Sequence, residues 1–474
     1  MKSLARPTAP ALLCLAILIA GITATLAAYW PGFMTWDAIR QYGQAVSGDF
    51  DDWHPPAMEW VWRQLIAIHA GPAPMLVLQL ILLWGGLAFL ATWAVRERRG
   101  GLAIAIMACG LMPFSLALTG EVLKDCLMAG ALMSAASVIA WRQSLPSKPL
   151  RIIMIVKAVA LLVFASALRF NAFLAVVPLA LALLPPAAWK TPLRMGATAL
   201  IVAALSLATM PVANRLLGAK PSGVGLSLII FDLGGITHFS GQNAFPPIAD
   251  FDDSDDPAGI VSACYDPSKW DRYAWWGAAP CDIGFDNVQE AFERQHINPY
   301  SWWLKQIAAH PIAYAEHRLA HFNINARLAS RDATERAVQI DSPPNEWGYK
   351  LQPSPILSMI DGAAMWSANT PFGWPIAWMA LALGLLILSP ALPSRRVIVP
   401  LALSALLYGL GYGVFSVASE LRYHLWTMLA AAVAAVIAGA DIRGGAECAK
   451  RRLLLAALPV AVTLSACFVW RLLF

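Results

Sequence analysis

The residues best suited to chemistry lie directly after the first long apolar segment of the chain. Asp37 follows that segment by a few residues, and His54 lies further along the same polar loop. Pro31 and Gly32 end the apolar helix ahead of them, and aromatic residues crowd the start of the loop, as they do at a membrane–water boundary. A carboxylate in this place suits chemistry on a substrate that is part lipid and part water-soluble group. The alternative is an ordinary polar loop in which Asp37 caps a helix.

Two short polar turns between later apolar segments carry further candidate residues. Glu121, Lys124 and Asp125 lie immediately before an apolar segment, and Arg169 and Asn171 lie between two others. Charges so close to hydrocarbon are costly unless they are paired or face water, so we treat them as candidate functional groups. The alternative is that Lys124 pairs with Glu121 or Asp125 and merely ends a helix.

The last polar turn holds Glu420, Arg422, Tyr423 and His424, again directly before an apolar segment. The apolar segments themselves contain few ionisable groups, with Lys157 as the clear exception. A transporter is expected to hold polar groups near the middle of the membrane. An enzyme that acts at the outer lipid surface would hold them where this chain does.

Composition indicates the elements that position these residues. The chain has 474 residues, of which 58% are hydrophobic and 13% are charged, whereas about 25% of residues are charged in a typical soluble domain. Apolar runs close to the roughly 20 residues that cross a bilayer recur along most of the chain. We therefore predict an all-α polytopic membrane protein. About 11 transmembrane helices are expected, near 11–30, 75–95, 101–118, 126–141, 152–168, 172–189, 195–213, 371–390, 397–416, 425–440 and 453–471.

Basic residues predict the orientation of these spans. They occur in short clusters at every second crossing, and such loops are usually cytoplasmic. The clusters are Lys2 and Arg6; Arg96, Arg98 and Arg99; Arg142, Lys148 and Arg151; Lys190 and Arg194; Arg395 and Arg396; and Arg443, Lys450, Arg451 and Arg452. We expect a multi-pass protein of the cytoplasmic (inner) membrane whose candidate site faces the outside or periplasm. Because topology explains the clusters, they do not indicate a nucleic-acid partner.

Composition also divides the chain into three parts. Residues 1–213 form an N-terminal transmembrane module that contains an outer loop, residues 31–73. Residues 214–352, richer in Asp, Pro, Gly and Trp, form a small α-rich extracytoplasmic domain, and residues 353–474 form a C-terminal transmembrane module.

The outer loop 31–73 is expected to contain two helical pieces. In the second piece, apolar residues recur at helical spacing, while Glu59 and Arg63 form an i,i+4 pair on another face. The apolar residues are Met58, Val61, Leu65 and Ile68. An amphipathic helix lying along the membrane fits this pattern. The alternative is the core helix of a packed loop.

The extracytoplasmic domain contains two features of interest. Cys264 and Cys281 are its two cysteines, and an oxidising compartment would allow them to form a disulfide. The acidic run Asp250–Pro257 resembles a calcium loop in charge but lacks the glycine and closing glutamate of an EF-hand. It is therefore interpreted as a solvated loop, with cation binding as the lesser alternative.

These features together resemble the membrane glycosyltransferases of the GT-C fold, a superfamily that includes protein O-mannosyltransferases and the lipid A aminoarabinose transferase. The resemblance rests on Asp37 in the first outer loop, on Glu121-Val122-Leu123-Lys124-Asp125 before a span, and on Glu420-Leu421-Arg422-Tyr423 at an outer helix end. It covers most of residues 1–213 and the last spans, but not residues 214–352.

The resemblance implies a sugar donor linked to a polyprenyl phosphate and an extracytoplasmic acceptor, which is a cell-envelope glycan, a lipid or a protein. Asp37 would be the general base, with Asp125 and Glu121 as further catalytic candidates. Cations would hold the departing phosphate. The residues assigned to the donor phosphate and substrate are His54, Lys124, Arg169, Asn171, Arg422, Tyr423 and His424.

The cofactor requirement stays open in the sequence. Some members of this superfamily use a divalent metal and others do not, and Asp37, His54 and Asp125 are the possible ligands here. The key acid is not part of an Asp-x-Asp motif. Two other classes of function remain: a transporter or flippase of lipid-linked sugars, and a scaffold of an envelope assembly.

Overall fold

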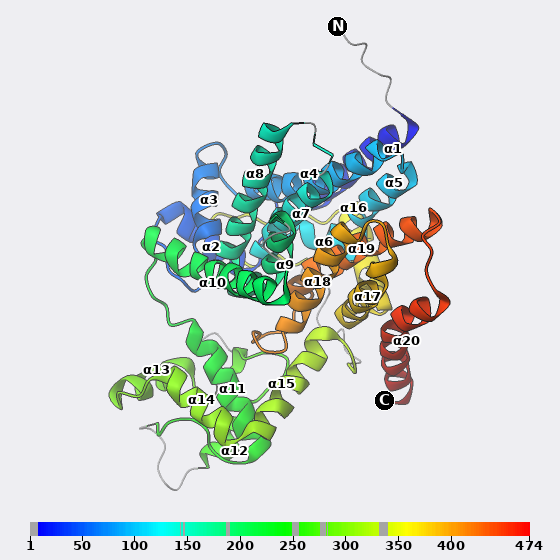
Figure 1. The fold of residues 1–474 in the computed structure, drawn as a ribbon. Helices are drawn as coiled ribbons and strands as arrows, with labels where there is room; N and C mark the ends of the chain where they lie inside the picture. Colours follow the sequence, from blue (N-terminus) through cyan, green and yellow to red (C-terminus); the bar gives the residue numbers. More distant parts are fainter. Residues whose placement is uncertain are drawn as a thin grey trace. The chain divides into compact units, whose positions relative to one another are not determined.

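A computed structural model describes residues 8–142, 144–145, 147–185, 190–248, 256–274, 281, 283–330 and 340–474. The described residues are helical, apart from turns, loops and isolated β-bridges, which confirms the predicted all-α class (Figure 1). The chain divides into two compact units. Unit 1 comprises Met1–Lys220, Asp332–Gly409 and Leu421–Phe474, and unit 2 comprises Pro221–Arg331 and Leu410–Glu420.

The first part of unit 1 supplies a series of helices joined by short turns. They are α1 (Ala9–Tyr29), α2 (Trp36–Ser47), α3 (Ala57–Ile66), α4 (Ala73–Arg96), α5 (Gly100–Cys109), α6 (Pro113–Thr119), α7 (Lys124–Trp141), α8 (Lys148–Leu168), α9 (Phe173–Leu183) and α10 (Pro192–Leu216). Several begin with proline in the first turn, where its missing N–H has no helical partner to lose.

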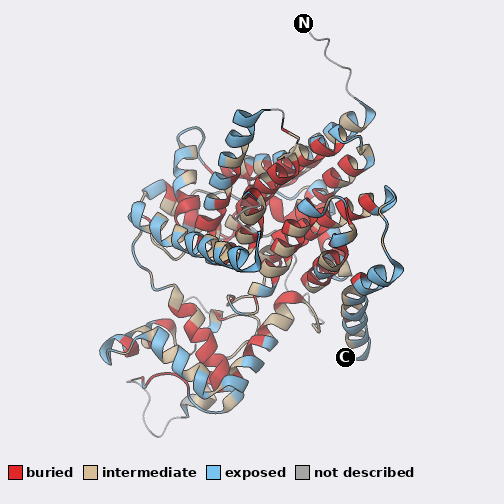
Figure 2. Ribbon diagram, in the orientation of Figure 1, coloured by how far each residue is buried: buried red, intermediate tan, exposed pale blue. Residues whose placement is uncertain are grey.

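The last part of unit 1 adds five α-helices, which are α16 (Pro355–Ala368), α17 (Pro375–Leu388), α18 (Arg395–Gly411), α19 (Leu425–Arg443) and α20 (Lys450–Leu473). Three short 3-10 turns join them, η4 (Pro371–Gly373), η5 (Ser389–Ala391) and η6 (Leu421–His424). The strongly buried helices are α7 and α19, while α10 and α20 present most of their length outward (Figure 2). An apolar helix that faces outward is stable when its surroundings are lipid, so this exposure fits a membrane protein.

Six described helices are long and apolar enough to cross a membrane, or seven if the bent pair α5–α6 counts as one span. The six are Ala9–Tyr29, Ala73–Arg96, Lys148–Leu168, Pro192–Leu216, Leu421–Arg443 and Lys450–Leu473. Each of the eleven predicted segments does contain a helix, but several of these helices are too short or too polar for that criterion. Several apolar helices therefore support a multi-pass membrane protein, and the count of eleven stays a prediction.

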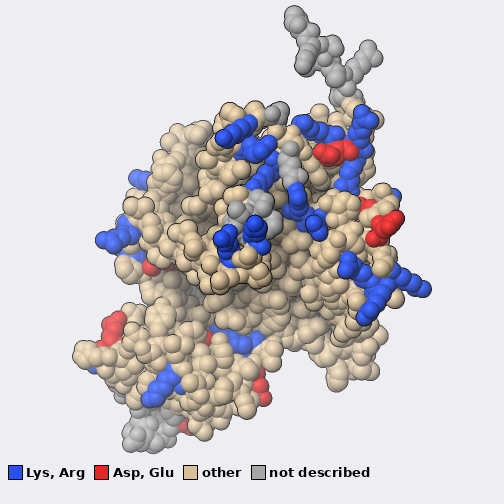
Figure 3. Space-filling view, in the orientation of Figure 1, with Lys and Arg blue, Asp and Glu red and all other residues tan. Residues whose placement is uncertain are grey.

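The turns predicted to be cytoplasmic meet at one end of unit 1. Arg99, after α4, pairs with Asp441 near the end of α19 at 2.7 Å and donates to Ser394 just before α18. Arg142, after α7, donates to the carbonyls of Ala182 and Leu184 at the end of α9. Many visible Lys and Arg side chains gather near the first turns of α5 and α8 (Figure 3). The alternation of polar turns read from the sequence thus corresponds to two ends of one helical body.

The outer loop 31–73 folds into α2 and α3, as predicted, but α3 is turned differently from the prediction. Glu59 is fully buried, and Arg63 donates to the carbonyls of Ala45 and Val46 in α2. The predicted Glu59–Arg63 pair is therefore wrong. Met58 is buried while Ile68 is 81% exposed, because α3 packs against α2, α4 and α8. The helix is a packed element of the loop.

The segment 340–352 belongs to unit 1 by its contacts, although the sequence assigned it to the extracytoplasmic domain. Trp347 and Tyr349 pack edge-on against Tyr42 of α2, with ring centroids 4.8 and 5.9 Å away. Tyr42 also contacts Trp62 of α3 and accepts a hydrogen bond from the Gly71 N–H. Aromatic packing from a distant part of the chain thus fixes α2 against α3.

Unit 2 is a small helical body around one buried polar network. Its helices are α11 (Gly225–Ser240), α12 (Pro257–Cys264), α13 (Phe285–Arg294), α14 (Pro299–Ala309) and α15 (Pro311–Ala326). Asp232 on α11 pairs with Arg318 and His317 of α15, and it accepts a hydrogen bond from the Trp303 indole of α14 at 2.8 Å. These three helices are therefore joined through one carboxylate.

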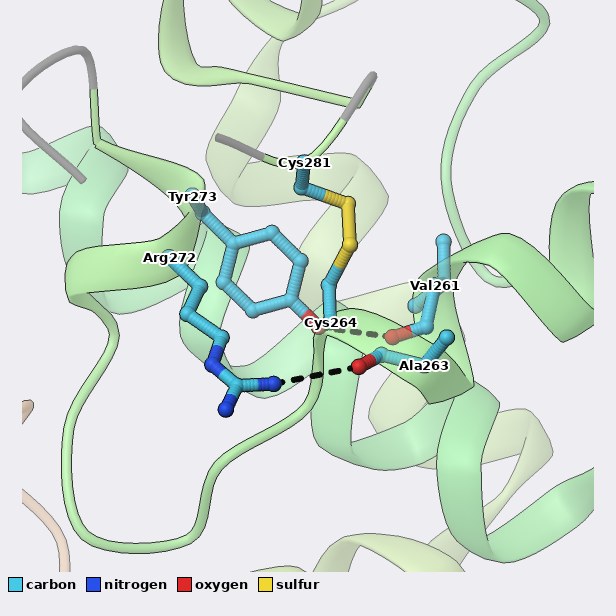
Figure 4. The surroundings of a disulfide bond; sticks show 6 residues. All are labelled: Val261, Ala263, Cys264, Arg272, Tyr273 and Cys281. Carbon is cyan, nitrogen blue, oxygen red and sulfur yellow. Dashed lines mark hydrogen bonds between the residues drawn. A yellow bond between two sulfur atoms is a disulfide. The ribbon is translucent and has the colours of Figure 1, made fainter. Parts of the chain in front are cut away.

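A disulfide joins Cys264, at the end of α12, to Cys281, which confirms the predicted pairing (Figure 4). Next to it, Arg272 donates to the Ala263 carbonyl and the Tyr273 hydroxyl donates to the Val261 carbonyl. The disulfide therefore holds Cys281 next to the C-terminal end of α12. The interpretation of the acidic run as a solvated loop or cation site falls on residues 250–255, which lie outside the described residues.

Candidate functional site

Main-chain pairing brings the first two candidate turns together. The Phe33 N–H donates to the Gly120 carbonyl at 3.3 Å, and the Val122 N–H donates to the Phe33 carbonyl at 2.8 Å. Thr35 then caps α2 by accepting a hydrogen bond from the Ala38 N–H. Because α2 and α7 both begin within a few residues of this pairing, Asp37 and Lys124 lie in one region.

Asp37 is held between a cation and an imidazole. Its Oδ2 lies 2.8 Å from Arg422 Nη2, and its Oδ1 lies 3.8 Å from His54 Nε2. Its side chain keeps 30% of its exposure, so the carboxylate is reachable. Burial alone would raise the pKa of Asp37, but the charges of Arg422 and Lys124, together with the neighbouring His54 ring, outweigh burial and hold the pKa well below its usual range. Asp37 is therefore ionised at neutral pH.

His54 links Asp37 to Lys124. The Lys124 ammonium lies 2.7 Å from His54 Nδ1 and donates to it, which assigns the ring proton to Nε2, the nitrogen that faces Asp37. Burial, reinforced by the charge of Lys124, lowers the pKa of His54 to about 3. His54 is therefore a neutral imidazole that can donate towards Asp37 while accepting from Lys124.

A second ion pair adjoins this group. Arg169, at the end of α8, pairs with Asp125 Oδ1 at 2.5 Å, and its Nε donates to Asn171 Oδ1 at 3.4 Å. Both arginines contact the Tyr423 ring, whose centroid lies 4.6 Å from the Arg169 guanidinium carbon and 5.5 Å from that of Arg422. Cation–π contacts of this kind hold guanidinium groups in place.

We call these residues the charged cluster; its members are Asp37, His54, Lys124, Asp125, Arg169, Arg422 and Tyr423. Their side chains come from the starts of α2 and α7, the end of α8, the loop before α3 and the turn η6. With His54 neutral, its formal charge is +1, because three cations (Lys124, Arg169, Arg422) face two carboxylates (Asp37, Asp125). A surplus of positive charge beside a reachable carboxylate suits the binding of an anionic ligand next to a second molecule that presents a hydroxyl group.

The remaining predicted residues border the cluster. Asn171 is fully buried and orients Arg169. His424 is fully buried at the end of η6. Glu121 is 3% exposed, and its carbonyl accepts a hydrogen bond from the Gln79 side chain at 2.7 Å. A role in holding the turn before α7 therefore accounts for the position of Glu121.

Metal binding gains no geometric support in the described part of the chain. The described residues contain no group of three or more His, Cys, Asp and Glu side chains placed to hold an ion. Asp37 and Asp125 each face an arginine, and His54 Nδ1 faces Lys124. The predicted ligand set therefore remains a prediction without a matching cluster.

Sequence reasoning did not assign two buried polar residues on α2 and α3 to the site. Gln41 lies one helical turn after Asp37 on α2, and Glu59 lies on α3; both are fully buried. The spacing of four residues from Asp37 to Gln41 was a usable signal, because such residues share a helix face. Nothing in the local sequence indicates that Glu59 points inward.

No protein-family model matches this chain, and neither the curated proteins nor the solved structures contain a match to it.

Proposed function

We propose that this chain is an integral membrane glycosyltransferase that moves a sugar from a polyprenyl-phosphate donor to an acceptor outside the cytoplasm. The observation that carries the proposal is the charged cluster, in which Asp37 shares one site with Lys124, Arg169 and Arg422. These residues lie at helix ends joined by polar turns, where a lipid-borne phosphate would meet water. Apolar helices that expose much of their surface support contact with a lipid donor.

Each group has a defined task in the proposed reaction. Asp37 takes the proton of the acceptor hydroxyl as that oxygen attacks the anomeric carbon of the donor. The bond from that carbon to the phosphate oxygen breaks, and the polyprenyl phosphate leaves with the electron pair. Arg422 and Lys124 hold the negative charge that develops on the phosphate, and Arg169 adds its positive charge nearby while it stays paired with Asp125.

The pairing of Asp37 with Arg422 in the absence of substrate supports a reaction in which the donor binds before Asp37 accepts a proton. While Arg422 pairs with Asp37, the low pKa of the carboxyl makes it a weak base. A donor phosphate that draws Arg422 away raises that pKa, because the neighbouring positive charge is then neutralised. Asp37 becomes a competent base when the donor is bound.

The decisive experiment replaces Asp37 by asparagine. Asp37→Asn keeps the size of the side chain and removes the base, so sugar transfer should fall by about 10²–10⁴-fold. Binding of the polyprenyl-phosphate sugar should persist, because other residues supply the cations. The assay follows labelled sugar from the lipid donor to membrane acceptors, with donor binding measured in parallel.

Asp49→Asn is the matched control, because Asp49 lies in the same loop but is 64% exposed and pairs with Lys220. It should transfer sugar like the unaltered protein. Normal transfer by Asp37→Asn would remove Asp37 from the base role. If the unaltered protein moves lipid-linked sugar across the bilayer and makes no glycosylated product, the chain is a transporter or flippase instead.

A further inference from the structure

Glu59 lies within electrostatic reach of Lys124, and its carboxyl group is sealed from solvent. The residue has no exposed surface, and neither carboxyl oxygen completes a hydrogen bond of normal geometry. It projects from α3 towards the interior formed with α2, where the equally buried Gln41 is its polar neighbour. A buried carboxylate without a bonded counterion is unstable, so such a group retains its proton.

The charged groups that act on Glu59 come from three parts of the site. Lys124 at the start of α7 and Arg40 on α2 favour its ionised form, and Asp51 in the loop between α2 and α3 disfavours it. Burial is the largest effect, and it raises the pKa of Glu59 to about 8 in spite of Gln41 and the two cations. The group is therefore neutral at pH 7 and ionises in the mildly alkaline range.

We propose that Glu59 is a positioning residue that sets the charge of the cluster: its neutral form leaves Lys124 available to an anionic substrate, and its ionised form competes for Lys124. This inference rests on the proposed function, because it treats the cluster as the place where a phosphate binds. With Glu59 neutral the formal charge of the group is +1, and with Glu59 ionised it is zero. Ionisation thus removes the surplus that attracts an anion.

The test measures binding of a phosphodiester whose charge is constant with pH. Citronellyl methyl phosphate carries one negative charge at both about pH 7 and about pH 9, so any change in its affinity belongs to the protein. Binding to the full-length protein in lipid nanodiscs should weaken by more than about tenfold between these two pH values, because Glu59 gains a negative charge and Lys124, whose pKa burial lowers to about 8, loses a positive one.

Three variants assign part of that change to Glu59. Glu59→Gln should lose roughly five- to tenfold less affinity than the unaltered protein, the order expected from one charge, because Lys124, whose pKa burial lowers to about 8, still titrates. Gln41→Leu should move the loss of affinity to higher pH, because the Gln41 amide favours ionisation. Glu290→Gln, a control at an exposed glutamate, should behave like the unaltered protein. An unchanged pH dependence in Glu59→Gln would overturn the proposal and assign the effect to another group, such as Lys124.

Stability gives a second readout that requires neither binding nor transfer. The folded state keeps the Glu59 proton up to about pH 8, whereas the unfolded chain releases it near the ordinary value of 4.5. Because the folded state then binds more protons, stability falls as pH rises through this window. The melting temperature of Glu59→Gln should therefore fall less steeply with pH than that of the unaltered protein. An identical dependence on pH in the two proteins would show that Glu59 is not neutral in the folded state.

Failure of the two proposals can be told apart. If no sugar transfer is found but the diester still binds with a Glu59-dependent pH profile, the glycosyltransferase assignment fails and the control of charge by Glu59 stands. If transfer occurs and Glu59→Gln keeps the pH profile of the unaltered protein, the role of Glu59 fails alone.

Discussion

Asp37 and Asp125 both face an arginine, yet their surroundings give them different tasks. Asp37 keeps 30% of its side-chain exposure, whereas Asp125 keeps 2% and its partner Arg169 keeps 10%. A reachable carboxylate can exchange its partner when a substrate arrives. A buried pair cannot exchange its partner without leaving a charge unpaired in the apolar interior. Asp125 and Arg169 are therefore better suited to holding α7 against the end of α8.

Removing Asp125 should therefore destabilise the protein strongly. Asp125→Ala removes the carboxylate that pairs with the buried Arg169, for which the expected loss of stability is about 3–5 kcal/mol. The same change at the exposed Asp49–Lys220 pair should cost at most about 1 kcal/mol. Thermal unfolding of both variants in detergent measures the difference, and equal melting temperatures would show that the Asp125–Arg169 pair does not hold the two helices.

Small residues allow the two main helices of unit 1 to approach closely. A Cβ atom at Gly86 of α4 would lie 2.7 Å from the Ser134 nitrogen of α7, and one at Gly130 of α7 would lie 2.9 Å from the Leu82 Cβ of α4. Close approach of backbones at small residues stabilises helix pairs in membranes. Since α7 begins with Lys124 and Asp125, this packing also determines where the cluster forms.

Adjacent glycines provide a matched test of that packing. Gly86→Ala should destabilise the protein by about 1–3 kcal/mol, because its methyl group would meet backbone atoms that cannot move aside independently. Gly85→Ala is the control, since a Cβ there has no neighbour within 4 Å and alanine favours a helix. Denaturation in detergent compares the two variants. An equal loss of stability in both variants would show that packing between α4 and α7 does not determine the effect of the substitution.

At the scale of the whole molecule, the two ends of unit 1 differ in kind. One end joins basic turns through Arg99, Asp441 and Arg142, and the other holds the charged cluster. From the positive-inside tendency we expect the basic end to face the cytoplasm. The proposed reaction needs this orientation, because its acceptor lies outside.

Labelling of single cysteines in intact cells tests this orientation. With the native free cysteines replaced, a cysteine at Lys305 in α14 should react with a membrane-impermeant maleimide, because unit 2 is expected on the outer side. A cysteine that replaces Arg396 in α18 should react with the maleimide only after the cells have been permeabilised. The reverse pattern would place the cluster in the cytoplasm and would contradict the proposed function.

The sequence by itself determined the helical class and the ends at which the polar residues lie, because apolar runs and short charged turns are local patterns. It also indicated the Cys264–Cys281 pair. Tertiary structure alone decided that Asp37 meets Arg422, 385 residues later in the chain, because that contact depends on how several helices pack. It also decided that Glu59 points inward. A ten-residue helix such as α3 is turned by its neighbours, and its own spacing of apolar residues is too weak to fix which face they cover.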